Sequence, residues 1–103
     1  MTLEELKKRC ESQGFQYAYG KFEEVVEPPH IIAIIAESNN VIADDRIYLK
    51  KEKVQLDYTY TSKDIEMQNK IENEILGDVV WSKTEETYLS EEGTWQVSYF
   101  FEI

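Results

Sequence analysis

The sequence predicts an α+β domain in which two helices pack on one face of a mainly antiparallel sheet of about five to six strands. Two amphipathic segments, one ending near Gly14 and one near Gly77, flank a series of short segments typical of strands. Aromatic residues make up 13% of the 103 residues, and seven of them are tyrosines, a composition that favours strands over a helical bundle. The length fits a single domain, residues 1–103.

The first helix is expected to begin after Thr2, whose hydroxyl can cap it, and to end near Gly14. Leu3, Leu6 and Cys10 fall on one face at helical spacing. Cys10 is the only cysteine, so no intramolecular disulfide can form. Its place on the apolar stripe predicts a buried structural thiol rather than a nucleophile, because the chain has a single histidine to activate it.

Two strands are predicted next, at residues 15–19 and at about 30–37, separated by a connection that ends in two prolines. The second strand contains the run Ile31–Ala36, "IIAIIA", which is apolar on both faces. Strands with one wet face alternate instead. Two interpretations remain: a central strand covered on both sides, or a strand with one face left for a neighbouring subunit.

The segment 38–45, "SNNVIADD", is rich in turn formers and is predicted to be a loop. A short strand at 46–50 and a tight connection at 51–53 follow. Residues 54–61 then alternate apolar with polar side chains and predict a half-buried strand.

A second helix is expected after Thr61 or Ser62, either of which can cap it, and Gly77 is expected to end it. Two final strands, at 79–88 and 94–103, are joined by the turn "SEEG" and complete the order α-β-β-β-β-α-β-β. The apolar stripe of this second helix is Met67, Ile71 and Ile75.

Charge excludes several classes of partner. Eleven Lys and Arg against 21 Asp and Glu give a formal net charge of −10, which repels nucleic acids and anionic membranes. The longest apolar run is far shorter than the roughly 20 residues that span a bilayer. The first residues lack the apolar core of a signal peptide, so the chain is expected to be cytosolic where it is made.

No catalytic residue, metal site or cofactor is predicted. The sequence has no phosphate-binding glycine motif and no nucleophile elbow. His30 follows two prolines at a strand entrance, where a rim residue is expected rather than a base. Asp44 and Asp45 lack the spacing of a calcium loop, and Arg46 would compete for their carboxylates, so they are interpreted as turn residues.

Several stretches together carry a family resemblance. They are the entry Pro28-Pro29 before the apolar strand, the step Ala43-Asp44 before Ile47-Tyr48, "VQLDYTYTSKD" before the second helix, "ETY" at 86–88 and "QVSY" in the last strand. In this pattern, nearly the whole chain after residue 15 resembles the small minor tail, tail completion and head–tail joining proteins of siphophages and prophages of Gram-positive bacteria. The family often has Asn at the position of Asp45 and an aromatic residue at that of His30.

The resemblance implies a tail-terminator-like fold and a non-enzymatic structural role at the head–tail junction. It implies a ring of copies, a hexamer in related tail proteins, around the DNA channel; some tail terminators are monomeric when free and assemble only on a completed tube. The implied partners are further copies, the tail tube and the head connector. The implied location is the host cytoplasm during assembly and then the virion. A net charge of −10 fits a channel through which DNA slides without being bound.

The predicted contact with partners or other copies is the segment from 38 to 46, because it is polar and continues the doubly apolar strand. An ordinary solvent-exposed connection is the alternative interpretation of this segment. The candidate contact residues are Ser38, Asn39, Asn40, Asp44, Asp45 and Arg46.

Two other classes of function remain. One is a small acidic α+β regulatory domain that binds a basic peptide or a cationic ligand, which a deep pocket with convergent polar groups would favour. The other is an enzyme, for which the sequence offers no nucleophile–base pair.

Overall fold

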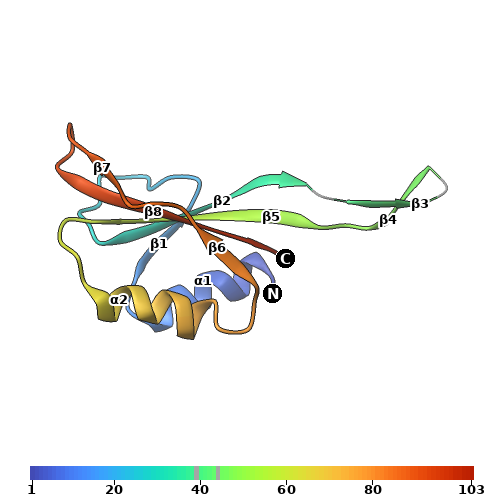
Figure 1. Ribbon diagram of the computed structural model, residues 1–103, viewed down its shortest axis with the longest axis horizontal. Coiled ribbons are helices and arrows are strands. Elements are labelled where there is room, and N and C mark those ends of the chain that lie inside the picture. Colours follow the sequence, from blue (N-terminus) through green and yellow to red (C-terminus); the bar gives the residue numbers. More distant parts are fainter. Residues whose placement is uncertain (39, 44) are drawn as a thin grey trace.

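The computed structural model describes residues 1–38, 40–43 and 45–103, and it confirms the predicted α+β class (Figure 1). Both helical segments lie on one face of the sheet, and the molecule measures 50 × 27 × 27 Å. The elements in chain order are α1 (Leu3–Ser12), β1 (Gln16–Tyr19), β2 (His30–Ser38), β3 (Val41–Ala43), β4 (Arg46–Leu49), β5 (Glu52–Tyr60), α2 (Ile65–Asn69), η1 (Lys70–Ile75), β6 (Trp81–Lys83), β7 (Thr87–Leu89) and β8 (Thr94–Glu102).

Six strands form the main sheet, in the order β1-β2-β5-β8-β6, with β7 pairing with β8 beside β6. Every pair in it is antiparallel except β1 with β2, which are parallel. The strands β3 and β4 form a separate two-stranded sheet. The parallel pair and the separate hairpin are the two features that decide where candidate sites can form.

The first helix is confirmed in detail. The Thr2 hydroxyl accepts a hydrogen bond from the Glu5 backbone N–H at 3.1 Å, so it caps α1. Gly14 has a φ of +86°, the left-handed conformation that ends many helices. Leu6 and Cys10 are fully buried against the sheet, which bears out the buried position of the thiol.

The second helix begins later than predicted. Asp64 caps it, and its carboxylate accepts hydrogen bonds from the backbone N–H groups of Glu66 and Met67; the expected caps at 61 and 62 are wrong. A carboxylate at this position also faces the positive end of the helix dipole. The second half, η1, is wound as a π-helix, in which the Leu76 N–H donates to the Ile71 carbonyl at 2.9 Å.

The core lies between these helices and one face of the sheet. The predicted alternation of β5 and β8 is confirmed, since every second residue of each strand is buried there. The buried residues of these strands on the helix side include Val54, Leu56, Tyr58, Val97, Tyr99 and Phe101. The opposite, outer face of the sheet carries the residues between them.

Two predicted boundaries are wrong. Residues 79–88 form two strands, because the chain leaves the sheet at 84–86. There the Thr84 hydroxyl, in place of a backbone carbonyl, accepts a hydrogen bond from the Ser98 N–H at 3.1 Å. The connection expected at 51–53 is largely part of β5, since Glu52 and Ile103 exchange backbone hydrogen bonds and lengthen the ladder.

A close backbone approach makes Gly77 necessary at the end of the second helix. A Cβ built there would lie 2.1 Å from the Asn73 carbonyl oxygen. We expect Gly77→Ala to lower the free energy of unfolding by roughly 1–3 kcal/mol, because backbone atoms must move. Urea unfolding followed by circular dichroism measures the change. Glu74→Ala, at an exposed site of η1, is the control, and an equal loss in both variants would contradict the steric explanation.

Candidate functional site

The segment predicted to be a loop contains a strand. Residues Val41–Ala43 form β3, which pairs with β4, and Ala43 lies opposite Arg46 at the closed end of this hairpin. The loop prediction for 38–45 is therefore wrong for these three residues, because neighbours rich in turn formers concealed a strand of only three. It is also wrong for Ser38, which ends β2. We call residues 39–49 the arm. Figure 1 shows the β3–β4 hairpin projecting beyond β2 and β5, away from the part of the sheet that the helices cover.

The base of the arm is fixed by specific contacts. Ala36 is an extra residue in β2, since Ile35 pairs with Val54 and Glu37 with the next residue, Lys53. Such a bulge increases the local twist and redirects the strand. Beyond it, the Asn40 side-chain oxygen accepts a hydrogen bond from the Lys51 N–H at 3.1 Å.

Of the predicted contact residues that the structure describes, Ser38 precedes the arm, and Asn40, Asp45 and Arg46 lie at different points along it. Ser38 is exposed and ends β2, and Asn40 is held by Lys51. Asp45 lies in the turn with a φ of 58°, and Arg46, also exposed, begins β4. The other two predicted residues, 39 and 44, lie outside the described part of the chain. That these residues contact a partner stays a prediction.

The strand that is apolar on both sides, β2, is covered differently on its two faces. Ile31 and Ala33 are buried on the helix side, while Ile32 and Ile34 are half-buried on the outer face. β2 lies between β1 and β5, as the central-strand interpretation expects. Segment 20–29, which connects the parallel strands, crosses the outer face near the end that carries β7 (Figure 1).

Between this segment and the sheet lies a cavity of about 600 Å³. A row of outward-facing residues in register, His30, Thr59 and Gln96 on β2, β5 and β8, forms its floor. Thr94 lines it beside this row, and the side chains around them are largely apolar. These surrounding residues are Phe22, Val25, Val26, Pro28, Ile32 and Leu89.

Two buried polar atoms at this cavity have no hydrogen-bond partner. They are Nδ1 of His30 and Oγ1 of Thr94, and the Thr94 residue is only 6% exposed. Buried polar atoms in folded proteins almost always find partners. Because neither atom is exposed here, a polar group from outside would reach them only after the side chains at the cavity floor shift. The volume lies within the range of about 300–1,000 Å³ typical of ligand pockets.

The electrostatics of the cavity favour a cation. Burial lowers the pKa of His30, although backbone hydrogen bonding to residues 26–27 and the nearby Glu92 carboxylate act in the opposite direction. The imidazole is therefore mainly neutral near pH 7, and a neutral imidazole that donates one N–H to the backbone keeps its other ring nitrogen as an acceptor. Glu24 and Glu92, both exposed, add negative charge at the rim. The Phe22 ring stands edge-on to the imidazole, with centroids 5.2 Å apart.

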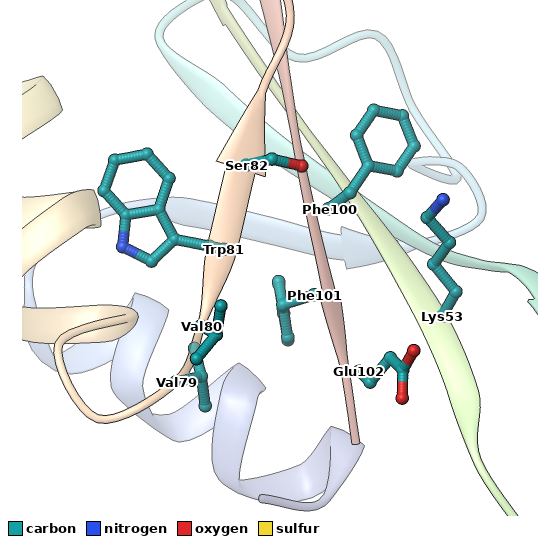
Figure 2. A pocket seen from close by; sticks show the side chains of 8 residues that line it. All are labelled: Lys53, Val79, Val80, Trp81, Ser82, Phe100, Phe101 and Glu102. Carbon is teal, nitrogen blue, oxygen red and sulfur yellow. The ribbon is translucent and has the colours of Figure 1, made fainter.

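A second hollow, of about 510 Å³, lies at the edge of the sheet where the chain enters β6. Figure 2 shows Trp81 and Phe100 pointing to opposite sides there. The Lys53 ammonium lies 5.1 Å from the centre of the Phe100 ring, and Val80 is 94% exposed. This hollow lies at a strand edge, and within the described part of the chain none of its lining residues carries a buried polar atom without a hydrogen-bond partner.

The single cysteine, Cys10, lies in the core, away from these surfaces. Burial raises the pKa of the Cys10 thiol to about 12, so it stays protonated near neutral pH. Within the described ranges, no group of three or more His, Cys, Asp or Glu lies close enough together to hold a metal ion. No helix in the described part of the chain is long and apolar enough to cross a membrane.

Comparison of the sequence with protein-family models and with characterised proteins finds no match. Only the residues of this chain therefore support the candidate surfaces. Sequence reasoning placed His30 at a strand entrance but did not find Thr59, Thr94 and Gln96 as its neighbours. The only available signal was the polar alternation on the outer sides of the predicted strands, which does not reveal that a connection covers them.

The pH dependence of stability tests the environment of His30. Its lowered pKa means that the folded state binds the proton less readily than the unfolded chain, whose value is near 6.5. The wild-type protein should therefore lose stability as pH falls from about 7 to about 5.5, relative to His30→Gln.

Urea unfolding of both proteins at a series of pH values measures this difference. Glu72, Asp78 and Glu86 have lowered pKa values and titrate at lower pH. Because both proteins carry these carboxyl groups, their effect cancels in the comparison. Parallel stability curves for the two proteins would contradict a burial-lowered pKa.

Proposed function

We propose that this protein is a non-enzymatic structural protein of a phage or prophage tail. It acts as a tail completion or tail terminator protein at the head–tail junction, where its copies form a ring around the DNA channel. The sequence pattern that resembles small siphophage tail proteins supports this role, and so does the α+β fold with helices on one face.

The arm is the observation that carries the proposal. β3 and β4 pair with each other and, among the described residues, with no other strand. An isolated two-stranded hairpin is at best marginally stable in water, and an apolar one gains most when another surface covers it. The arm is apolar in sequence at Val41, Ile42, Ala43, Ile47, Tyr48 and Leu49.

Charge supports the ring around DNA. A protein that holds DNA does so with Lys and Arg, which release counterions from the phosphates. This chain has 21 acidic against 11 basic residues. A ring of such subunits lets DNA pass through its channel without retaining it.

The alternative function is a small acidic domain that binds a basic peptide or a cationic ligand. The cavity over His30 favours it, because unpartnered acceptors converge there below an acidic rim. The two functions differ in what is assembled: the alternative predicts a 1:1 complex with a peptide and no self-assembly.

Removal of the arm tests the proposed role. Ser38 and Glu52 face each other in the ladder, so an Asn–Gly turn can replace residues 39–51 and join them. We expect this variant to fold, because the core between the helices and the main sheet is unchanged. We expect that it no longer assembles. Circular dichroism checks the fold. Light scattering against concentration and electron microscopy with tail tubes measure assembly.

The wild-type protein and the exposed-site variant Glu11→Gln serve as controls and should behave alike. A wild-type protein that stays monomeric at high concentration, and that binds neither tail tube nor connector protein, contradicts the proposal. Assembly that persists without the arm contradicts the arm as the contact. A major tail protein gene beside the gene for this chain would add independent support.

A further inference from the structure

The cavity and the arm lie at opposite ends of the same strand. β2 begins with His30, on the cavity floor, and ends with Ser38, where the arm starts. Nine residues of strand at about 3.3 Å each separate these points by roughly 25–30 Å, and the arm then extends further in the same direction (Figure 1). The arm therefore cannot reach the cavity of its own chain.

What the cavity lacks is a donor of hydrogen bonds that also carries positive charge. Neutral His30 offers a ring nitrogen as an acceptor, and Thr94 offers a hydroxyl oxygen. A guanidinium group has several N–H donors, no acceptor, and an apolar stem that suits apolar walls. The carboxylates at the rim would attract the same group before it enters.

The arm carries such a group at its tip. Arg46 is exposed, begins β4, and stands opposite Ala43 where the hairpin closes. Its side chain forms no ion pair within the described part of the chain.

We propose that the cavity receives the arm tip of a second copy of this chain, where the Arg46 guanidinium donates hydrogen bonds to His30 and Thr94 and faces Glu24 and Glu92. This contact is head-to-tail, since each copy offers its arm to one neighbour and its cavity to another. The inference rests on the proposed function, because it assigns the contact between neighbouring copies in the proposed ring. The contact and the function can fail separately.

Disulfide trapping tests the contact directly. A protein with Asp45→Cys is mixed with a protein with Glu91→Cys under mild oxidation, so that Arg46 and the residues of the cavity are kept. We expect a mixed disulfide dimer to form at least about tenfold faster than in a mixture of Asp45→Cys with Glu74→Cys, because docking raises the local concentration of the two thiols. Glu74 is an exposed acid on η1 and serves as the matched control. The buried Cys10 is present in every protein and cancels.

Complementation supplies a second measurement. Arg46→Glu disables the arm and leaves the cavity, whereas Thr94→Val with Glu24→Gln and Glu92→Gln removes an acceptor and the rim charge of the cavity and leaves the arm. Each protein alone should remain a monomer, and their mixture should form a dimer and no larger species. Equal trapping rates, or an Arg46→Glu protein that assembles like the wild type, would overturn the inference.

Failure of the arm-in-cavity contact and failure of the proposed function give different results. Rings that form normally with Arg46→Glu would overturn the arm-in-cavity contact and leave the proposed function standing. Rapid trapping in a protein that binds no tail tube or connector would support the contact and count against the tail function.

Discussion

The parallel pairing of β1 with β2 determines where the chain must go for the next ten residues. Parallel neighbours cannot be joined by a tight hairpin, so the chain has to return along the sheet before it can begin the second strand. The helices already occupy one face, and segment 20–29 therefore returns over the other. Gly20 starts this return with a φ of +81°, and its N–H still bonds to the Ala33 carbonyl. The cavity over His30 is the space left beneath that connection.

The helix layer sets the second constraint, because it is shorter than the strands that it covers. On β2, burial ends after Ile35, and the last three residues of the strand are exposed. The ladder nevertheless continues through Glu37, which lies 3.7 Å from Lys53 in a surface ion pair. Such a pair contributes little to stability. The arm is therefore an extension held by backbone pairing, with no helix layer of this chain beneath it.

One polar network shows how the helix layer is attached to the sheet. Glu72 of η1 accepts hydrogen bonds from the Tyr99 hydroxyl at 2.7 Å and from Lys83 at 2.8 Å. Burial alone would raise the pKa of Glu72, but these two donors outweigh it and lower the pKa. Arg9 of α1 hydrogen-bonds to Asp78 and to the Ile75 carbonyl, which joins the two helical segments to each other. Both sets of contacts involve the helix layer, and neither includes a residue of the arm.

The sequence predicted those parts of the fold whose signals are local. The cap at Thr2 and the stop at Gly14 defined α1, and the alternation of β5 and β8 identified the buried face. Strand β3 of the arm was missed because "VIA" is too short to show a period and stands between turn formers, whereas β4 agrees with the strand predicted at 46–50. The cavity could not be predicted, since Thr59 and Thr94 meet His30 only after three strands pair in register. No local pattern encodes that register.

The ends of β2 differ in charge, and this difference favours a head-to-tail self-contact. Two arms that meet across a two-fold axis would place Asp45 of one copy near Arg46 of the other and would leave the carboxylates of Glu24 and Glu92 without a basic partner. A head-to-tail contact places Arg46 among carboxylates instead, in a molecule with a net charge of −10. Head-to-tail contacts form closed rings when the rotation between neighbours divides a full turn, and open filaments otherwise. The twist added by the bulge at Ala36 aims the arm relative to the body, so this one extra residue helps to set that rotation.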